Sequence, residues 1–324
     1  MSTRICVVGC GAVGSLFAAH LAQLEETEVL AYDLSRPHVD AINRDGLRIV
    51  GKANLVARLR ATDDAAELPP CDFGIVATKG YATAPAIEAT AHCFAEGYVA
   101  SVQNGVGNEE VIAARIGAQR VLLGTTFPAG HLVEPGVVAM DTTGDTWLGP
   151  FGQDLSMMPA VERLADLLTR SGMPTKALPD ARGAQWNKLV FNAATNPLGA
   201  LTGLTHGEVC EQPGLRRLVS GLIDEALAVA TALGIVVDGD PEALVDHAAV
   251  VAHDHRASML QDVAARRRTE IDSLNGGIAT LGRSCGVATP LNDAIVALVE
   301  GLEASYGVRR TEHDSGASSR EGKG

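Results

Sequence analysis

The segment 184–197 carries three polar side chains at helical spacing among mostly apolar residues. Lys188, Asn192 and Asn196 recur every four residues, so on a helix they form one polar stripe. An ammonium and two amides on a buried helix are costly unless they meet partners or a ligand. An ammonium can also stabilise a carbonyl oxygen that gains charge, and then protonate it. The stripe predicts a binding or catalytic surface, the alternative being a solvated face or amides that cap a neighbouring helix. Pro197 predicts that this helix ends or kinks at Asn196.

A second candidate segment begins at Ser258 and reaches Glu270, twelve residues later. On a straight helix that separation is about 18 Å of rise and about 120° of rotation. The two side chains could not touch one small substrate unless the helix bends. We therefore expect separate roles, with Ser258 near a substrate carboxylate and Glu270 near a cofactor ribose or near Lys188.

A glycine-rich loop close to the N-terminus indicates a dinucleotide site. The loop consists of Gly9, Cys10, Gly11, Ala12, Val13 and Gly14, which matches G-x-G-x-x-G between a β-branched run and an apolar helical pattern. In such loops the first glycine permits a tight turn, the second lets a pyrophosphate approach the backbone, and the third lets the helix pack closely on the strand. The helix start also attracts an anion. Asp33 ends the next apolar run, where an acidic residue would hold the adenosine ribose.

Two further polar residues follow strand-like runs. Lys79 comes after the apolar run 72–76, and Asn104 comes after the run 99–102. Ligands of parallel sheets lie outside the carboxyl ends of the strands, so we expect Lys79 to meet a phosphate or the adenine edge, and Asn104 the nicotinamide side. The alternatives are a solvated loop lysine and an ordinary Asn-Gly turn.

The pattern of elements changes once along the chain. Over residues 1–179 strands alternate with helices, which predicts an α/β domain with a doubly wound, largely parallel sheet. Residues 125–149 would extend that sheet in antiparallel fashion. Residues 180–308 predict an all-α domain, and the polar residues 309–324 predict a disordered tail. The helices expected in the second domain are 184–196, 214–233, 241–255, 258–283 and 291–306.

Composition and charge exclude several classes of protein. The 324 residues suffice for two domains, and 46% hydrophobic residues are typical of a soluble globular protein. No apolar run reaches the roughly 18 residues of a membrane-spanning helix, and a strand at the N-terminus leaves no room for a secretory signal. The cysteines lack metal-binding spacing, so we expect reduced thiols, no metal and a cytoplasmic location. The net charge of −13 argues against nucleic-acid or membrane partners. The expected partner is a small molecule, and a homodimer stays open.

Together these motifs resemble the ketopantoate reductase (2-dehydropantoate 2-reductase) family, in order and over nearly the whole chain outside the tail. The resemblance rests on the glycine loop, Lys79-Gly80, Gln103-Asn104-Gly105, the Lys188, Asn192 and Asn196 stripe with Pro197, and the segments 258–262 and 269–272. It implies a Rossmann domain, a helical C-terminal domain and a cleft between them. It also implies that Lys188 is the general acid, that Asn192, Asn196 and Ser258 bind substrate, that Asn104 reaches both cofactor and substrate, and that Glu270 lies on the cofactor side.

The chain departs from the family pattern at two positions. The best-known members use NADPH and place a basic residue after the second strand, where this chain has Asp33. A carboxylate repels a 2′-phosphate and accepts hydrogen bonds from free ribose hydroxyls, so we predict NAD, with NADP left open by the nearby Arg36. The family often has a substrate asparagine before a Gly-Glu pair, where this chain has His206, which we assign to the substrate pocket.

The expected reaction is hydride transfer between NAD(P)H and C2 of a 2-keto or 2-hydroxy acid, ketopantoate being the first substrate to test. One alternative is an NAD-dependent dehydrogenase of the same family that oxidises a different hydroxy acid, with His206 reshaping the pocket. A β-hydroxyacid dehydrogenase of the 6-phosphogluconate type is a poorer match around Lys188. A non-catalytic redox sensor that binds dinucleotide and a protein partner is the remaining alternative, and the polar stripe argues against it.

Overall fold

The computed structural model describes residues 2–317, with side chains as far as Tyr306. Backbone contacts divide the chain into two compact units, Met1–Gln185 and Trp186–Gly324, here called the N-terminal unit and the helical unit. The division falls inside one helix, α6 (Arg182–Thr202), a few residues beyond the change of sequence pattern at 179.

The N-terminal unit is built on an eight-stranded sheet with the order β12-β11-β8-β7-β6-β1-β2-β5. Its strands are β1 Thr3–Val8, β2 Thr27–Tyr32, β5 Arg60–Thr62, β6 Phe73–Val76, β7 Tyr98–Ser101, β8 Val121–Thr126, β11 Thr146–Pro150 and β12 Thr175–Ala177. All pairings from β5 to β8 are parallel, whereas β11 runs antiparallel to β8. The prediction of a doubly wound α/β fold is confirmed.

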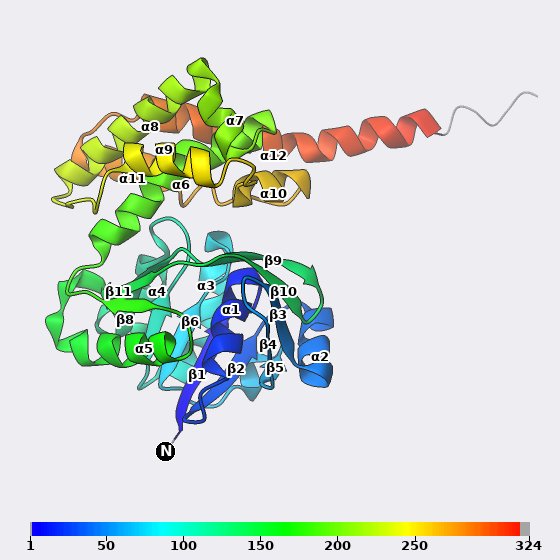
Figure 1. The fold of residues 1–324 in the computed structure, drawn as a ribbon, viewed down its shortest axis with the longest axis vertical. Helices are drawn as coiled ribbons and strands as arrows, with labels where there is room; N and C mark the ends of the chain where they lie inside the picture. Colours follow the sequence, from blue (N-terminus) through cyan, green and yellow to red (C-terminus); the bar gives the residue numbers. More distant parts are fainter. Residues whose placement is uncertain (1, 318–324) are drawn as a thin grey trace, which may run out of the picture. The chain divides into compact units, whose positions relative to one another are not determined.

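Both faces of this sheet are covered by helices (Figure 1). One face carries α1 (Ala12–Leu21) and α5 (Met158–Arg170), and the other carries α3 (Thr83–Thr90) and α4 (Asn108–Ile116). Strand β1 contributes to the apolar cores on both faces of the sheet, because successive strand residues point to opposite faces. Ile5 and Val7 belong to the core with α1 and α5, and Cys6 and Val8 to the core with α3 and α4. A strand buried on both sides therefore reads as a continuous apolar run.

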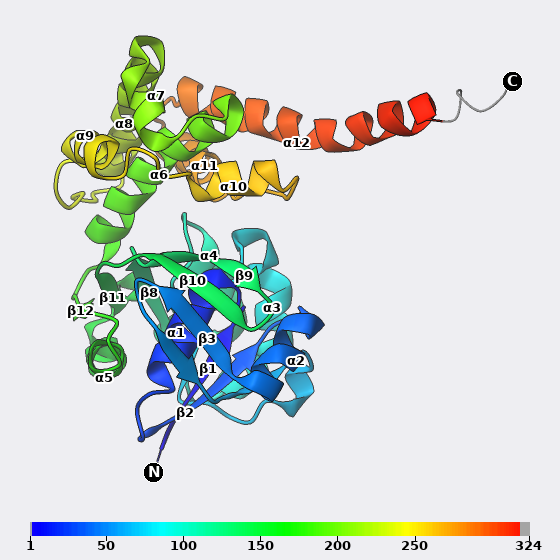
Figure 2. The same cartoon turned by 45° about the vertical axis from the view of Figure 1, so that its right-hand side comes forward.

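A second sheet of four strands, with the order β4-β3-β10-β9, packs against α1 (Figure 2). Its strands are β3 Leu47–Gly51, β4 Leu55–Ala57, β9 Ala129–Glu134 and β10 Val137–Thr142, and α2 (Arg36–Asp45) precedes β3. The prediction that all of 125–149 extends the main sheet is wrong, since only β11 does so. Strand β10 is fully buried on one face alone, where Val138 and Met140 lie, and it meets that apolar layer as the neighbour of β3.

The helical unit contains no strand among its described residues. It comprises the later part of α6, followed by α7 His206–Glu211, α8 Pro213–Ala232, α9 Pro241–Val251, α10 Ser258–Ala264, α11 Asn275–Cys285 and α12 Pro290–Ala317. Helices α8, α11 and α12 pack on one another, and α7 packs on α8 and α9. The all-α prediction is confirmed. Within residues 2–317 no helix has both the length and the apolar character to span a membrane.

The single helix expected over 258–283 is interrupted. Helix α10 ends at Ala264, and Arg266 takes the left-handed conformation with a φ of 51°. The Arg266 N–H donates to the Val263 carbonyl at 2.9 Å, and the Arg267 N–H to the Asp262 carbonyl at 2.8 Å. These two bonds form a Schellman motif, which satisfies the last carbonyls of α10 and turns the chain away.

Two helix ends also differ from expectation. Of the two outcomes expected at Asn196, an end of the helix is wrong, because α6 continues through Pro197 to Thr202. Helix α12 continues to Ala317, into the segment 309–324 for which the sequence predicts a disordered tail. The chain has no proline after Pro290, so no residue there lacks the N–H that a helix needs. The rest of the predicted tail, 318–324, lies outside the described residues.

Candidate active site

Each glycine of the N-terminal loop has the local geometry that a bound pyrophosphate requires. Gly9 turns directly after β1 with a φ of 86°. A Cβ on Gly14 would lie 2.1 Å from the Gly9 carbonyl oxygen, so a side chain there would push α1 off the strand. A Cβ on Gly11 would meet nothing within 4 Å, so its backbone is open to approach. Because α1 begins at Ala12, its first N–H groups lack helical acceptors, and the loop fits a dinucleotide phosphate.

The thiol inside this loop is not a nucleophile. Burial raises the pKa of Cys10 to about 12, so the thiol stays protonated near neutral pH. The Ser15 hydroxyl donates to the Cys10 carbonyl oxygen at 2.9 Å, which ties the loop to the first turn of α1. Cys10 serves as a small buried side chain beneath the loop.

The other cofactor candidates of the N-terminal unit follow strands that are neighbours in the sheet. Strands β7, β6, β1 and β2 lie side by side and run parallel. Asn104, Lys79, the glycine loop and Asp33 follow their respective carboxyl ends. Residues spread over about a third of the chain are thus brought to one sheet edge, which is where doubly wound sheets bind dinucleotides.

Asp33 is held at the end of β2 by its own loop. Its Oδ1 accepts a hydrogen bond from the Ser35 N–H at 2.8 Å, and the side chain is partly exposed. Arg36, the nearby cation, is 74% exposed and pairs with Asp63 at 3.5 Å. At this strand end the structure therefore presents a carboxylate, and the guanidinium is turned to another acid.

A buried amide, to which the sequence motif assigned no role, joins the loops that follow β6 and β7. Gln103 Nε2 donates to the Thr78 carbonyl at 2.9 Å and to the Thr83 hydroxyl at 2.7 Å, and the residue is 6% exposed. In the loop between β7 and α4, the Asn104 carbonyl accepts a hydrogen bond from Asn108 Nδ2 at 3.2 Å. In the sequence Gln103 appeared only as a member of the motif Gln103-Asn104-Gly105, without a role of its own. These bonds hold the backbone on which Lys79 and Asn104 are carried.

A buried carboxyl group lies behind the Asn104 loop and was also missed. Glu109, in the first turn of α4, is 2% exposed and accepts a hydrogen bond from Gln185 Nε2 at 3.1 Å. Burial raises its pKa to about 8, against the lowering effect of its hydrogen bonds, so it is mostly protonated at neutral pH. Gln185 Nε2 also lies 3.5 Å from the Gly105 carbonyl oxygen. The first turn of α6 is therefore tied to this loop within the N-terminal unit.

In the helical unit, α6 presents the predicted stripe. Lys188 is partly buried, and Asn192 and Asn196 are buried. Burial lowers the pKa of Lys188 to about 8, and the nearby charge of Glu270 opposes this shift. Glu270, 8% exposed, lies between α10 and α11. Both protonation states of Lys188 are accessible near neutral pH, as a proton donor or acceptor requires.

Ser258 and Glu270 are not members of one straight helix. Ser258 is the exposed first residue of α10, and Glu270 follows the break at Arg266. The separation of about 18 Å expected for a straight helix therefore does not apply. The charge of Glu270 raises the pKa of Lys188, which is consistent with one of the two positions that the sequence left open for Glu270.

His206, the departure from the family pattern, is 6% exposed and has contacts on three sides. Its ring stacks on Phe191, with 5.2 Å between ring centroids, and its Nε2 lies 3.3 Å from the Val245 carbonyl oxygen. Its backbone N–H donates to the His255 carbonyl at 3.1 Å. Burial lowers its pKa, so the ring is neutral. His206 thus packs against the α6 residue that precedes Asn192.

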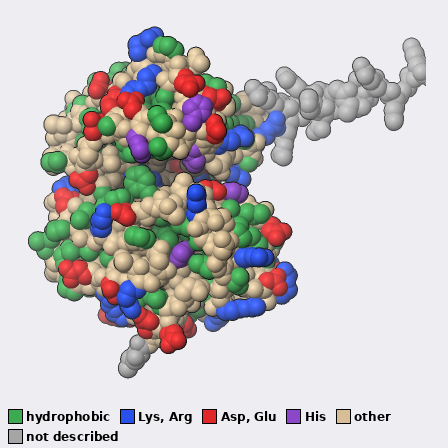
Figure 3. Space-filling view, in the orientation of Figure 1, with side chains coloured by type: hydrophobic (Ala, Val, Ile, Leu, Met, Phe, Trp, Pro, Cys, Tyr) green, Lys and Arg blue, Asp and Glu red, His purple; other side chains and the backbone are tan. Residues whose placement is uncertain are grey.

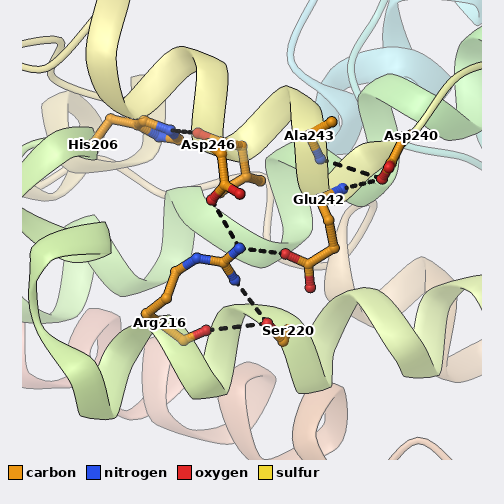
Figure 4. A network of polar contacts seen from close by, with 8 residues as sticks. His206, Arg216, Ser220, Asp240, Glu242, Ala243 and Asp246 are labelled. Atoms are coloured by element: carbon orange, nitrogen blue, oxygen red, sulfur yellow. Dashed lines mark hydrogen bonds and ion pairs between the residues drawn. The ribbon is translucent and has the colours of Figure 1, made fainter.

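Helix α9, which provides the Val245 carbonyl, is anchored by charge (Figure 4). Arg216 of α8 pairs with Glu242 and, at 2.8 Å, with Asp246. Asp240 caps the start of α9 by accepting from the Glu242 and Ala243 N–H groups at 3.0 and 3.2 Å. Figure 3 shows further histidine side chains at the surface of the helical unit. In this unit His247 on α9 and His255 in the segment after it are exposed, and His253 is partly exposed.

Comparisons with known proteins agree with this arrangement. The family model described as "Ketopantoate reductase PanE/ApbA" matches residues 5–153, and the model "Ketopantoate reductase PanE/ApbA C terminal" matches residues 180–303. The 2-dehydropantoate 2-reductase of Pyrococcus abyssi is 32% identical over 305 residues, covering 94% of this chain and 99% of that protein. The enzyme of the same name from Pyrococcus horikoshii is 33% identical over 304 residues, with the same coverage.

Solved structures are similar over the same length. A PanE/ApbA family ketopantoate reductase from Ralstonia eutropha JMP134 has a TM-score of 0.85 at 28% identity, covering 94% of this chain and 99% of that one. A D-mandelate dehydrogenase in a ternary structure with NADH and anilino(oxo)acetate has a TM-score of 0.87 at 26% identity, with the same coverage.

Proposed function

The chain belongs to the ketopantoate reductase family, and we propose that it transfers hydride between NAD(P)H and C2 of a 2-keto acid, reducing 2-dehydropantoate to pantoate. It is a nicotinamide-dinucleotide-dependent oxidoreductase that acts on a CH–OH group. The observation that carries the proposed mechanism is Lys188, whose pKa of about 8 results from burial opposed by the charge of Glu270, and which lies on the helix that also presents Asn192 and Asn196.

In this mechanism the bound nicotinamide supplies the hydride. The Lys188 ammonium stabilises the charge that develops on the C2 oxygen and then donates a proton to it. The charge of the Glu270 carboxylate raises the pKa of Lys188, so the ammonium persists to a higher pH. The amides of Asn192 and Asn196 orient the substrate, Ser258 meets its carboxylate, and Asn104 reaches both cofactor and substrate.

For the cofactor we propose NAD rather than NADP. Asp33 stands where the adenosine ribose is held, and Oδ1 is already engaged by Ser35, which leaves Oδ2 to accept from a ribose hydroxyl. A 2′-phosphate at that point would face a carboxylate. Arg36, the cation nearest in sequence, is directed to Asp63.

A second candidate is the NAD-linked oxidation of a different 2-hydroxy acid. It is favoured by the similarity to D-mandelate dehydrogenase and by His206, which stands before Gly207-Glu208 where the family often has a substrate asparagine. In this direction neutral Lys188 takes the proton from the alcohol.

Under either candidate we propose a cytoplasmic enzyme whose partner is a small molecule.

The test is a set of initial rates with the purified protein. We expect NADH-dependent reduction of ketopantoate, with kcat/KM at least about tenfold above that with NADPH, equivalent to about 1.4 kcal/mol. Lys188→Ala should lose about 10²- to 10⁴-fold in kcat. Lys176→Ala is the matched control, because that lysine pairs with Asp145 on the surface.

Each alternative predicts a different outcome of these assays. NAD-dependent oxidation of D-mandelate without reduction of ketopantoate would select the second candidate. A preference for NADPH would contradict the role of Asp33. Unchanged turnover in Lys188→Ala would overturn the catalytic assignment, and binding of dinucleotide without turnover of any hydroxy acid would leave the sensor.

A further inference from the structure

We propose that Asn275 is a positioning residue for Asn192 and Asn196, because its side chain supplies the hydrogen-bond donor that Pro197 removes from α6. The inference rests on the proposed function of α6 and goes beyond it, since neither the sequence motifs nor the mechanism above assigned Asn275 a role. It explains how α6, which carries the two substrate amides, can continue through Pro197, which directly follows the second amide.

The proline creates a specific deficit in α6. Pro197 lacks an N–H, so the carbonyl four residues earlier, that of Ala193, loses its normal helical donor. The pyrrolidine ring also crowds that carbonyl. Ala193 is 1% exposed, so water cannot take the place of the missing donor. A buried carbonyl of this kind needs a partner from elsewhere in the protein.

Asn275, the first residue of α11, provides that partner. Its Nδ2 donates to the Ala193 carbonyl oxygen at 2.9 Å and to Asn292 Oδ1 at 3.0 Å. Asn275 and Asn292 are both fully buried. Both protons of the amide are thereby used, which fixes the plane of the group. Among the described residues Asn275 Oδ1 has no partner, so the side chain is oriented for its donors.

The orientation of Asn275 is set by helices other than α6. Asn292 Nδ2 donates to Glu225 Oε2 at 2.8 Å, and the same carboxylate accepts from the Leu291 and Asn292 N–H groups at 2.8 and 3.0 Å. Glu225 lies on α8, and Asn292 in the first turn of α12. A chain of hydrogen bonds thus runs from α8 through α12 and α11 to one carbonyl of α6.

That carbonyl lies within the turn that bears the substrate amides. Ala193 directly follows Asn192, and Pro197 directly follows Asn196. Helices bend sharply at proline, so a loss of the Asn275 bond would let α6 bend between the two amides. Groups that bind a reacting substrate must be held within about 0.5 Å of their productive positions. Asn275 therefore acts on substrate through the geometry of α6, and not by contact with it.

The test pairs Asn275→Leu with Pro197→Ala. Asn275→Leu removes the donor at similar volume, and we expect the KM for the 2-keto acid to rise about 10- to 100-fold. The Kd for the dinucleotide should stay unchanged, because the dinucleotide loop belongs to the N-terminal unit. Pro197→Ala returns an N–H that can bond the Ala193 carbonyl. The KM of the double variant should therefore fall back close to the wild-type value.

The matched control is Asn43→Leu. Asn43 Nδ2 also donates to a backbone carbonyl, that of Ala61 at 2.8 Å, but it lies on α2 of the N-terminal unit. This variant should lower the unfolding temperature and leave the KM for the acid unchanged. If Asn275→Leu does not fold, Asn275→Ser, which cannot reach the carbonyl, is measured in the same way.

Three outcomes would overturn the inference. The first is a lower unfolding temperature of Asn275→Leu with an unchanged KM, which would mark a merely structural residue. The second is a double variant no better than Asn275→Leu. If the wild-type protein turns over no acid, the proposed function fails, and amide hydrogen exchange then decides the inference separately. Asn275→Leu should speed the exchange of the backbone amides in residues 193–202, and the addition of Pro197→Ala should reverse this. Unchanged exchange in Asn275→Leu is the third outcome that would overturn the inference.

Discussion

At the scale of single residues, the proposed proton transfer depends on how far the fold shifts the pKa of Lys188. An exposed lysine holds its proton far above neutral pH and is a poor acid there. Burial on α6 brings the pKa of Lys188 to about 8, while Glu270 limits the shift. The Lys188 side chain is therefore mostly protonated at neutral pH and can still release its proton to an alkoxide.

The pH dependence of the reaction should follow this group. Reduction needs protonated Lys188, so kcat/KM for the keto acid should be level below about pH 8 and fall about tenfold per pH unit above it. Oxidation needs the neutral amine and should rise through the same pH and then level off. Rates measured from about pH 6 to 10 in both directions check this.

The control for that profile is Glu109→Gln. The pKa of Glu109 is also raised to about 8, and glutamine keeps a neutral hydrogen-bonding side chain in its place. The profile of this variant should still bend near pH 8. Loss of the bend in Glu109→Gln, or a flat wild-type profile up to pH 10, would contradict the role of Lys188.

At the scale of elements, the break between α10 and α11 places Glu270. The sequence shows one helical pattern over 258–283, but the chain turns at Arg266, a residue in a conformation that favours glycine. An L side chain there costs about 1–2 kcal/mol. The Schellman bonds to the Asp262 and Val263 carbonyls, and the ion pair of Arg267 with Asp262 at 3.1 Å, hold the turn in spite of that cost.

Arg266→Gly should therefore stabilise the protein. Relief of the left-handed strain exceeds the added entropy of glycine in the unfolded chain, so we expect the free energy of unfolding to rise by about 0.5–1 kcal/mol. Urea denaturation measures it. Arg256→Gly, at an exposed arginine without a positive φ, should give no gain. A loss of stability in Arg266→Gly would show that the arginine side chain holds the turn by another contact.

At the scale of the whole molecule, the proposed cofactor residues and the proposed proton donor belong to different compact units. The N-terminal unit carries the glycine loop and the sheet edge, and the helical unit carries Lys188 and the amides of α6. Helix α6 begins in the first unit, where Gln185 is tied to Glu109, and continues into the second. Cofactor binding and proton transfer should therefore respond to different substitutions.

Ligand-induced stabilisation tests this division. At a hundred times its Kd, the dinucleotide should stabilise the unit that binds it by about 2.7 kcal/mol in the wild type and in Lys188→Ala. Gly11→Ala should fold normally, because its Cβ meets nothing within 4 Å, yet lose the stabilisation, because that Cβ blocks the pyrophosphate. Thermal unfolding with and without NADH measures both. A normal shift in Gly11→Ala would contradict the assignment of the loop.

Much of this protein is determined by sequence patterns that act over a few residues. The glycine loop, the alternation of strands and helices, and the four-residue spacing of Lys188, Asn192 and Asn196 each depend on local geometry. They predicted a doubly wound sheet followed by helices, and together with the motifs at Lys79, Asn104, 258–262 and 269–272 they indicated the family. The roles assigned to the individual site residues stay predictions, which the substitutions above test.

The tertiary structure decided whatever depends on groups far apart in the chain. Strands β9 and β10 joined a second sheet because β3, about 90 residues earlier, offered a partner and α1 an apolar cover. Helix α6 continued through Pro197 with a donor from Asn275, 82 residues beyond the carbonyl that it bonds. The pKa of Lys188 likewise depends on burial and on Glu270. Periodicity and propensity describe a residue's neighbours in sequence, whereas desolvation and the pairing of orphan backbone groups depend on its neighbours in space.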